Sequence, residues 1–283
     1  MLDIRPIDMS PAGIARTCKL LNVVYPHAPH LTTAYLDRLY NGNPLGPTFG
    51  FSAFENDELV GHYLMIPIAA TIFGKPDRGI WPFQLATHPG FRGKGLFTAL
   101  VERSFDAARE RGFTFFAGVG NQNSTPLFVG KWGFQSICQL DVKLGVGPIP
   151  ESRAGSDFQL LRTWDAPGIA WRLQHPAAPY RVQFRDGIGH LFAPAGKAGI
   201  WVQVGSFPEE MLPAGLEPLR TPNPLRLYIA ADSSRDFSRS LYVTVPMKYR
   251  PSPLNLLFYD LTDQKRRFDP KLVRYDLFDF DAY

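Results

Sequence analysis

The chain has 283 residues, of which 45% are hydrophobic, so it is long enough for one large domain or two smaller domains with buried cores. Its formal net charge of +4 is spread along the sequence, which argues against a dedicated nucleic-acid-binding surface. The two cysteines, Cys18 and Cys138, are too few for a disulfide framework, and no CxxC or Cys/His cluster indicates zinc.

The N-terminal sequence and the apolar runs predict a cytoplasmic protein. Residues 1–6 lack the basic region and the apolar core of a signal peptide. No apolar stretch approaches the ~20 residues that a membrane-spanning helix needs. We therefore expect no membrane partner.

The N-terminal part predicts a strand and two helices, followed by further strands. Residues 2–5 are typical of a short strand. Ser10 followed by Pro11 indicates a helix start, because serine caps the first N–H groups and proline is favoured in the first turn. Thr32 or Thr33 predicts the start of a second helix. The apolar patterns between residues 48 and 87 then predict strands joined by tight turns.

The clearest helix in the sequence follows a glycine-containing loop. Its apolar residues recur at steps of three and four: Phe97, Leu100, Val101, Phe105 and Ala108. Gly112 indicates its C-terminal end. Residues 113–119 form a near-continuous apolar run that predicts a buried strand. A short helix is expected to begin at Asn123 or Ser124 and to close at Gly133.

A stretch rich in proline, glycine and serine at residues 147–157 predicts a linker. We therefore expect one domain at 1–147 and a strand-rich domain at 158–283, in which frequent prolines limit the helix content. Strands are predicted at 137–146, as one strand or a pair, and at 181–184, 190–193, 200–204, 225–230, 241–245, 255–261 and 274–280. The last segment alternates acidic and aromatic residues, which predicts an edge or half-buried strand with its carboxylates in solvent.

The junction between residues 87 and 97 is the strongest functional signal. It reads Thr87-His88-Pro89-Gly90-Phe91-Arg92-Gly93-Lys94-Gly95-Leu96-Phe97, a strand that opens through a glycine loop into the helix. Backbone N–H groups and the positive end of the helix dipole converge at such a junction and make it an anion site. A pyrophosphate fits this description, so the junction predicts a cofactor.

Two downstream segments extend this pattern: Asn121-Gln122-Asn123-Ser124 and Lys131-Trp132-Gly133-Phe134. The whole arrangement resembles the GNAT acetyltransferase superfamily over residues 1–146, most sharply from 84 to 134. In the family loop pattern Arg/Gln-x-x-Gly-x-Gly/Ala, Arg92 and Gly95 match and Phe97 departs. The resemblance implies an α/β (α+β) fold with a mixed, mostly antiparallel central sheet flanked by helices.

Other segments look like a bacterial branch of this superfamily with an extra C-terminal domain. Among them is the string Trp171-Arg172-Leu173-Gln174-His175-Pro176. Residues 158–283 have the strand-rich pattern of a second, degenerate GNAT-like fold and carry no second Arg-x-x-Gly-x-Gly/Ala loop. We therefore expect one cofactor site per chain, with the C-terminal domain contributing to the acceptor site.

The resemblance implies that acetyl-CoA is the cosubstrate. Loop N–H groups would surround its pyrophosphate, the preceding strand end would pair with the pantetheine amides, and Asn123 would assist the cofactor arm. The implied cofactor-binding residues are Leu85, Ala86, Thr87, Arg92, Gly93, Lys94, Gly95, Leu96, Phe97 and Asn123. The alternative is a solvated turn in which the glycines only relieve backbone strain.

The proton-transfer residues stay open. Val129 stands where the family often has a tyrosine acid, and Gln84 stands on the strand that often supplies a carboxylate base. His62, Tyr63 and His88 are the titratable candidates, because a positioned side chain of this kind can take part in proton transfer. Each also has an ordinary alternative role: a hydrogen-bonded core histidine, a packing tyrosine and a solvent-facing turn residue.

These expectations combine into an acetyl-CoA-dependent N-acetyltransferase that acetylates a primary amine of a small acceptor, with an amino sugar as one acceptor class. No metal, nucleic acid or membrane partner is expected, and the oligomeric state is left open. One alternative is a non-catalytic acyl-CoA-binding or sensing protein, which Val129 and Gln84 favour. Another is an acyltransferase that uses a longer acyl donor.

Overall fold

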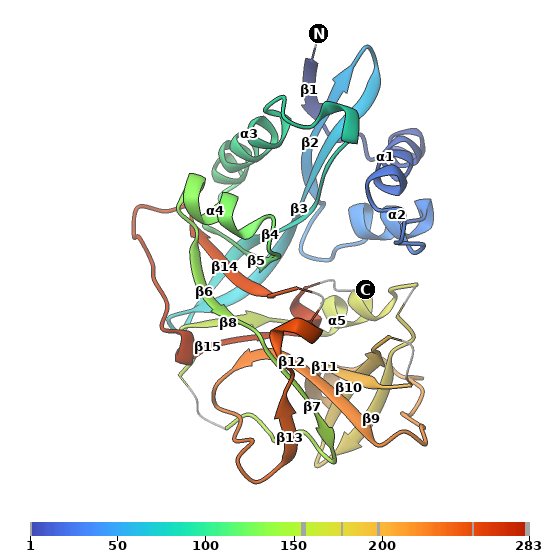
Figure 1. Ribbon diagram of the computed structural model, residues 1–283, viewed down its shortest axis with the longest axis vertical. Helices are drawn as coiled ribbons and strands as arrows, with labels where there is room; N and C mark the ends of the chain where they lie inside the picture. Colours follow the sequence, from blue (N-terminus) through green and yellow to red (C-terminus); the bar gives the residue numbers. More distant parts are fainter. Residues whose placement is uncertain (1, 154–156, 177, 197–198, 251, 281–283) are drawn as a thin grey trace. The chain divides into compact units, whose positions relative to one another are not determined.

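The computed structural model describes residues 2–153, 157–176, 178–196, 199–250 and 252–280 (Figure 1). Its backbone contacts fall into two units. The first unit comprises the residues up to Ile68 together with Arg78–Ala117 and Leu261–Asp263. The second unit comprises Ala69–Asp77, Gly118–Asp260 and the residues from Gln264 onward.

These units are interleaved in sequence. Ala69–Asp77 and Leu261–Asp263 each belong to a different unit from the residues that flank them. A boundary inferred from composition divides the chain into continuous segments. It therefore cannot detect short segments that belong to the other unit. The division into domains at 1–147 and 158–283 stays a prediction. Residues 154–156 at its boundary, and 1, 177, 197–198, 251 and 281–283 inside its domains, lie outside the described residues.

The first unit is a small sheet with helices on both sides (Figure 1). Its sheet runs in the order β1-β2-β3-β4, with antiparallel pairing of β1 with β2 and of β2 with β3. Figure 1 shows α3 on one side of these strands and α1 and α2 on the other. The elements are β1 (Leu2–Pro6), α1 (Pro11–Val24), α2 (Thr33–Asn41), β2 (Phe49–Glu55), most of β3 (Glu58–Ile72) and β4 (Lys75–Thr87), α3 (Leu96–Glu110) and the start of β5 (Phe115–Gly120).

The expected helix starts in this unit are confirmed. The Ser10 hydroxyl accepts a hydrogen bond from the Gly13 N–H and caps α1, and Thr32 caps α2 in the same way through the Tyr35 N–H. These side-chain oxygens satisfy N–H groups that have no partner within the helix. Gly112, with φ of +73°, follows the end of α3 as predicted.

The second unit is rich in strands, and its pairing is mixed but mostly antiparallel. One path runs β8-β15-β12-β11-β10-β9, with β8–β15 and β11–β12 parallel. β7 pairs with both β12 and β13, and β6 pairs with β14. The elements are α4 (Thr125–Trp132), β6 (Gln135–Gln139), β7 (Asp141–Val146), β8 (Leu160–Thr163), α5 (Ala166–Leu173), β9 (Arg181–Arg185), β10 (Ile188–Pro194), β11 (Trp201–Pro208), β12 (Leu225–Asp232), β13 (Leu241–Thr244), β14 (Asn255–Asp260), β15 (Val273–Asp276) and the short 3-10 turns η2 (Glu209–Met211), η3 (Met247–Tyr249), η4 (Pro270–Leu272) and η5 (Leu277–Asp279).

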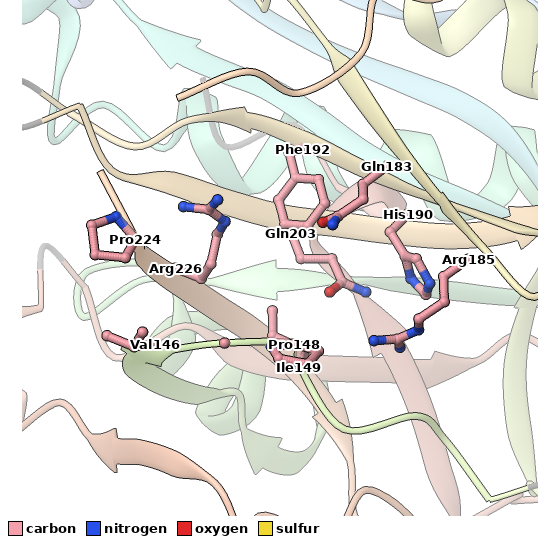
Figure 2. Close-up of a pocket in the computed structure, with 11 residues that line it drawn as sticks. Val146, Pro148, Ile149, Gln183, Arg185, His190, Phe192, Gln203, Pro224 and Arg226 are labelled. Carbon is pink, nitrogen blue, oxygen red and sulfur yellow. The ribbon is translucent and has the colours of Figure 1, made fainter. Parts of the chain in front are cut away.

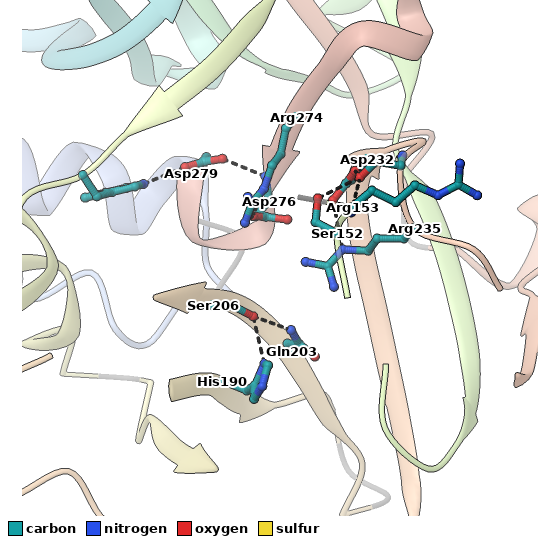
Figure 3. A network of polar contacts seen from close by, with 12 residues as sticks. Ser152, Arg153, His190, Gln203, Ser206, Asp232, Arg235, Arg274, Asp276 and Asp279 are labelled. Atoms are coloured by element: carbon teal, nitrogen blue, oxygen red, sulfur yellow. Dashed lines mark hydrogen bonds and ion pairs between the residues drawn. The ribbon is translucent and has the colours of Figure 1, made fainter. Parts of the chain in front are cut away.

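The C-terminal segment is not a continuous strand, so the strand expected over 274–280 is wrong beyond Asp276. β15 ends there and η5 follows. The Asp279 carboxylate is buried rather than solvated, and it accepts hydrogen bonds from the Asp276 N–H at 2.7 Å and from Trp164 Nε1 at 2.8 Å (Figure 3). Burial raises the pKa of Asp279 to about 6.

Two buried arginines explain why the segment turns. Arg172 Nε donates to the Phe278 carbonyl at 3.2 Å, and its Nη2 donates to the Phe280 carbonyl at 2.8 Å. Arg162 donates to the Asp279 carbonyl. The guanidinium groups therefore satisfy main-chain carbonyls that a neighbouring strand would otherwise have to satisfy.

Sequence reasoning missed α5 and β8. Frequent prolines predict few helices in this part of the chain, yet Pro167 lies in the first turn of α5, where proline is tolerated. The Asp165 carboxylate caps this helix through the Gly168 N–H at 2.8 Å. Asp165 followed by Pro167 is the same kind of start signal as Ser10 followed by Pro11, and it was available in the sequence.

Candidate functional site

The glycine loop lies between the end of β4 and the start of α3. After Thr87, a single 3-10 turn (η1, Pro89–Phe91) reverses the chain, and His88 Nδ1 accepts the Gly90 N–H at 3.2 Å. His88 therefore has a local role in shaping the turn, and its side chain is half-buried. Arg92 is extended, and α3 begins at Leu96.

Both loop glycines have left-handed backbones. Gly93 has φ of +76° and Gly95 has φ of +77°, a region that other residues rarely adopt. A Cβ atom added at either position would meet no atom within 4 Å. Glycine is required here by the dihedral angles and not by crowding, and the space above the loop is open. The N-terminus of α3 faces this loop, as an anion site requires.

The charged side chains of the loop are exposed, whereas the start of α3 is anchored. Arg92 and Lys94 lie on the surface, and Lys94 Nζ is 4.6 Å from the centre of the Phe91 ring. Leu96 is buried and Phe97 is half-buried, so their side chains contribute to packing. The Phe97 departure from the loop pattern is therefore compatible with the backbone role of the loop.

Leu85, Ala86 and Thr87 form the last residues of β4. The pairing register of β4 with β5 covers Gly79 with Phe115 and Ile80 with Phe116, which leaves the end of β4 beyond that register. The Ala86 side chain is buried, and the Leu85 carbonyl accepts a hydrogen bond from the Tyr25 hydroxyl at 3.0 Å. Sequence reasoning missed Tyr25, because it lies just after α1 and far from the loop in sequence.

Asn123 lies in an exposed turn of the second unit. The organising residue of this turn is Asn121, whose side-chain oxygen accepts the N–H groups of Asn123 and Ser124, both at 2.9 Å. Ser124 precedes α4, which ends at Gly133 with φ of +71° as expected. The structure gives Asn123 a side chain that faces solvent and a backbone held by Asn121.

A chain of buried hydrogen bonds leads to Gln84 on β4. The Ser52 hydroxyl lies 3.2 Å from His62 Nδ1, the Tyr40 hydroxyl lies 2.8 Å from His62 Nε2, and the same hydroxyl donates to Gln84 Oε1 at 3.2 Å. Because the Tyr40 hydrogen is used by Gln84, His62 donates from Nε2 and accepts from Ser52 at Nδ1. Tyr40 and Ser52 were missed in the sequence, although Ser52 and His62 face each other in the β2–β3 register.

Gln84 itself has an unusual backbone. Its φ is +50°, which is uncommon for a residue with a side chain and tends to occur where function needs it. Its side chain is only 9% exposed, and its Nε2 finds no hydrogen-bond partner in the described part of the chain. Gln84 therefore presents a strained, buried amide donor on β4, directly before Leu85.

The three titratable candidates are in different environments. Burial lowers the pKa of His62 to about 3, so the ring is neutral at physiological pH. Tyr63 is buried, its pKa is raised by burial, and its hydroxyl has no hydrogen-bond partner among the residues described. Neither group is poised to exchange a proton at neutral pH, and His88 serves the η1 turn.

The position expected for a tyrosine acid lies on α4. Val129 is 37% exposed and carries no proton donor. Its neighbour Phe128 is buried against Trp132 and Phe134. Within the residues that the structure describes, no three His, Cys, Asp or Glu side chains form a metal-binding group, and no helix is long and apolar enough to cross a bilayer.

Two cavities lie wholly within the second unit. One, of about 570 Å³, begins at Gly120 and Asn121 beside the turn that contains Asn123. Its walls are mostly aliphatic and include Val142, Val202, Leu227, Ile229 and Leu254. The other, of about 450 Å³, has a mixed polar and apolar lining and is shown in Figure 2. Both volumes are in the range of small-molecule sites.

Comparison with sequence families identifies the N-terminal segment. Residues 7–137 match the profile of a family described as an acetyltransferase (GNAT) domain. This match covers the glycine loop, the end of β4 and the turn at Asn121. No curated protein sequence matches the chain.

Solved structures with the same fold cover most of the chain. A probable N-acyltransferase from Enterococcus faecalis V583 is 9% identical with a TM-score of 0.65, over 92% of this chain and 73% of that chain. A GCN5-related N-acetyltransferase from Anabaena variabilis is 10% identical with a TM-score of 0.63, over 92% and 73%. Eis1 from Mycobacterium abscessus is 14% identical with a TM-score of 0.56, over 92% and 74%. The expected mixed α/β fold of the GNAT type is thereby confirmed.

Proposed function

We propose that this chain, in which residues 7–137 are a domain of the GNAT acetyltransferase family, transfers an acetyl group from acetyl-CoA to a primary amine of a small acceptor. The observation that carries this proposal is the loop with left-handed Gly93 and Gly95 directly before α3. Such a loop offers backbone N–H groups to a pyrophosphate without side-chain obstruction. We also propose a cytoplasmic location and a bacterial source.

In this proposal, the loop residues Arg92–Phe97 hold the pyrophosphate, and Leu85–Thr87 pair with the pantetheine amides. The open space above both glycines fits a bound anionic group. Tyr25 holds the Leu85 carbonyl at 3.0 Å, which fixes the orientation of the strand end. Arg92 and Lys94 add positive charge at the surface of the loop. Asn123 is proposed to assist the cofactor arm.

In this proposal, the protein contributes to the reaction mainly by positioning the amine next to the thioester. A neutral amine nitrogen attacks the thioester carbonyl, an N–C bond forms as the C–S bond breaks, and the nitrogen proton passes through solvent to the departing thiolate. The Gln84 side chain is an amide and cannot act as a base. It supplies a hydrogen-bond donor, Nε2, on β4. Binding and desolvation of an already neutral amine then account for the rate. We expect activity to rise with pH until the acceptor amine is deprotonated.

We propose that the C-terminal domain contributes to the acceptor site, and one cavity of about 570 Å³ lies in the second unit beside Asn121. Its aliphatic walls favour an acceptor that carries an apolar surface next to its amine. An amino sugar, the acceptor class suggested by the resemblance to the bacterial branch, is more polar than such an acceptor. Turnover with glucosamine and with 2-phenylethylamine separates these two acceptor classes.

The test has two stages. Calorimetry with acetyl-CoA is expected to show saturable binding, and the absence of binding up to about 1 mM contradicts the proposal. Thiol release is then measured with a panel of primary amines. Binding without release across the panel favours the alternative of a non-catalytic acyl-CoA sensor. Tighter binding and faster release with a longer acyl-CoA favour the alternative of a longer donor.

A further inference from the structure

The mixed cavity of the second unit has an apolar floor and polar groups at its ends (Figure 2). Its volume is about 450 Å³, which suits a ligand of small-molecule size. Val146, Pro148 and Ile149 lie along one side, and Phe192 lies across from them in Figure 2. All lining residues belong to the second unit, whereas the glycine loop belongs to the first. The cavity is therefore lined without any residue of the loop.

Arg226 supplies an uncompensated positive charge at one end of the cavity. Its Nη1 donates to the carbonyls of Asn223 at 2.7 Å and Leu225 at 3.0 Å, which fixes the guanidinium in place. No carboxylate of the described residues forms an ion pair with Arg226. Loss of water around the group lowers the pKa of Arg226, with the nearby Tyr242 acting in the opposite direction. An arginine keeps its charge under such a shift and is stabilised by an anion.

His190 supplies a hydrogen-bond donor at the other end. It is only 5% exposed, and its Nδ1 lies 3.0 Å from the Ser206 hydroxyl (Figure 3). That hydroxyl already accepts the Gln203 Nε2 hydrogen at 2.8 Å, so its own hydrogen is available to Nδ1. The remaining ring hydrogen then lies on Nε2, which has no hydrogen-bond partner among the described residues.

The other charges near His190 largely compensate each other. Arg185 forms an ion pair with Glu151, and the Glu151 carboxylate lies 3.5 Å from His190 Nε2. Burial lowers the pKa of His190 below its ordinary value, Glu151 raises it, and the charges of Arg185 and Arg235 lower it. The ring is therefore neutral near pH 7. The cavity therefore carries one net positive charge, on Arg226, and a neutral hydrogen-bond donor at His190.

We propose that this cavity is a second ligand site, which binds a small organic acid through its carboxylate at Arg226 and through a hydroxyl or carbonyl oxygen at His190. The apolar body of the acid lies against Ile149 and Phe192. A buried polar nitrogen with no partner is costly in a folded protein, and an oxygen of the ligand removes that cost. Charge-assisted hydrogen bonds to the guanidinium supply the preference for an acid over its neutral analogue.

The test uses 4-hydroxybenzoate as the probe and 4-hydroxybenzamide as its neutral analogue, in calorimetry on the full chain. We expect saturable binding of the acid and binding of the amide that is at least about tenfold weaker. Arg226→Gln is expected to weaken binding of the acid at least about tenfold, and His190→Phe several-fold. Arg267→Gln removes the same charge from an exposed site of the same unit and should leave binding unchanged.

Three results overturn the proposal: no saturable binding of 4-hydroxybenzoate up to about 10 mM, equal binding of acid and amide, or unchanged binding to Arg226→Gln. Methyl NMR of the unsubstituted protein provides a readout that does not depend on the folding of a variant. Shifts of the Val146 and Ile149 methyl groups on addition of the acid support the site. Shifts confined to other methyl groups contradict it.

Discussion

The Nε2 atom of His62 lies 2.8 Å from the hydroxyl oxygen of Tyr40, within the core of the first unit. The Tyr40 hydroxyl donates its hydrogen bond to Gln84 Oε1, so His62 is a neutral donor to the Tyr40 oxygen. The pair holds the side chain of Gln84 at the strained position of β4. The His62–Tyr40 pair orients the side-chain amide of Gln84. Its contribution to the free energy of unfolding depends on pH.

The first prediction concerns that pH dependence. The folded pKa of His62 is lowered to about 3, below the unfolded value of about 6.5, so the unfolded chain binds more protons between these values. The stabilisation is complete above pH 6.5 and is lost as the pH falls. We expect about 2 kcal/mol of the unfolding free energy to be lost through His62 between pH 7 and pH 5. Urea unfolding of His62→Gln should lack this loss.

The exposed His27 provides the matched control for this measurement. His27→Gln removes a histidine of the same unit without removing a buried ring, and it should lose stability with acid as the unsubstituted protein does. If His62→Gln and His27→Gln show the same acid sensitivity, the buried neutral state of His62 is contradicted.

The second prediction separates backbone strain from ligand binding in the loop. Gly95→Ala places a side chain at φ of +77°, which costs about 1 kcal/mol of unfolding free energy. Gly112→Ala, at the other end of α3 with φ of +73°, should cost the same, because neither Cβ meets an atom within 4 Å. Only Gly95→Ala should weaken acetyl-CoA binding in calorimetry. Equal weakening in both variants would place the pyrophosphate elsewhere.

These two sites show what the sequence could and could not predict. The glycine loop was predictable because its strand, glycines and helix are contiguous, and contiguous residues carry their geometry in their order. The Tyr40–His62–Gln84 chain was not, because it joins α2, β3 and β4 through side chains that no local pattern connects. The sequence identifies His62 as a titratable group, but its burial, which lowers its pKa, is a tertiary property.

The same distinction holds for the end of the chain. Alternation of acidic and aromatic residues after Arg274 predicts a strand, and the chain is a strand up to Asp276. Beyond it, the buried Arg162 and Arg172 supply hydrogen bonds to the main chain, so the segment turns. These arginines are more than 100 residues away in sequence, so the periodicity of the segment itself cannot predict their effect.

The third prediction uses the buried carboxylate of that segment. The folded pKa of Asp279 is raised to about 6 by burial, above the unfolded value, so the folded chain binds more protons between about pH 4 and pH 6. This contribution to stability is present below pH 4 and is lost as the pH rises, by about 3 kcal/mol in total. Asp279→Asn should remove this fall in urea unfolding. Asp157→Asn, at an exposed position of the same unit, should retain it, and a fall that persists in Asp279→Asn contradicts the assignment.

The fourth prediction concerns Arg172, which is 1% exposed and donates to the Phe278 and Phe280 carbonyls. Arg172→Ala leaves both carbonyls without this donor and opens space in the core, so we expect a loss of about 3 kcal/mol of unfolding free energy. Arg172→Lys should also destabilise, because an ammonium group does not reproduce the planar fork that reaches both oxygens. Arg267→Ala, at an exposed site, should change the unfolding free energy by no more than about 0.5 kcal/mol. Hydrogen exchange of the η5 amides gives the local readout: protection that survives in Arg172→Ala would show that the arginine does not hold the turn.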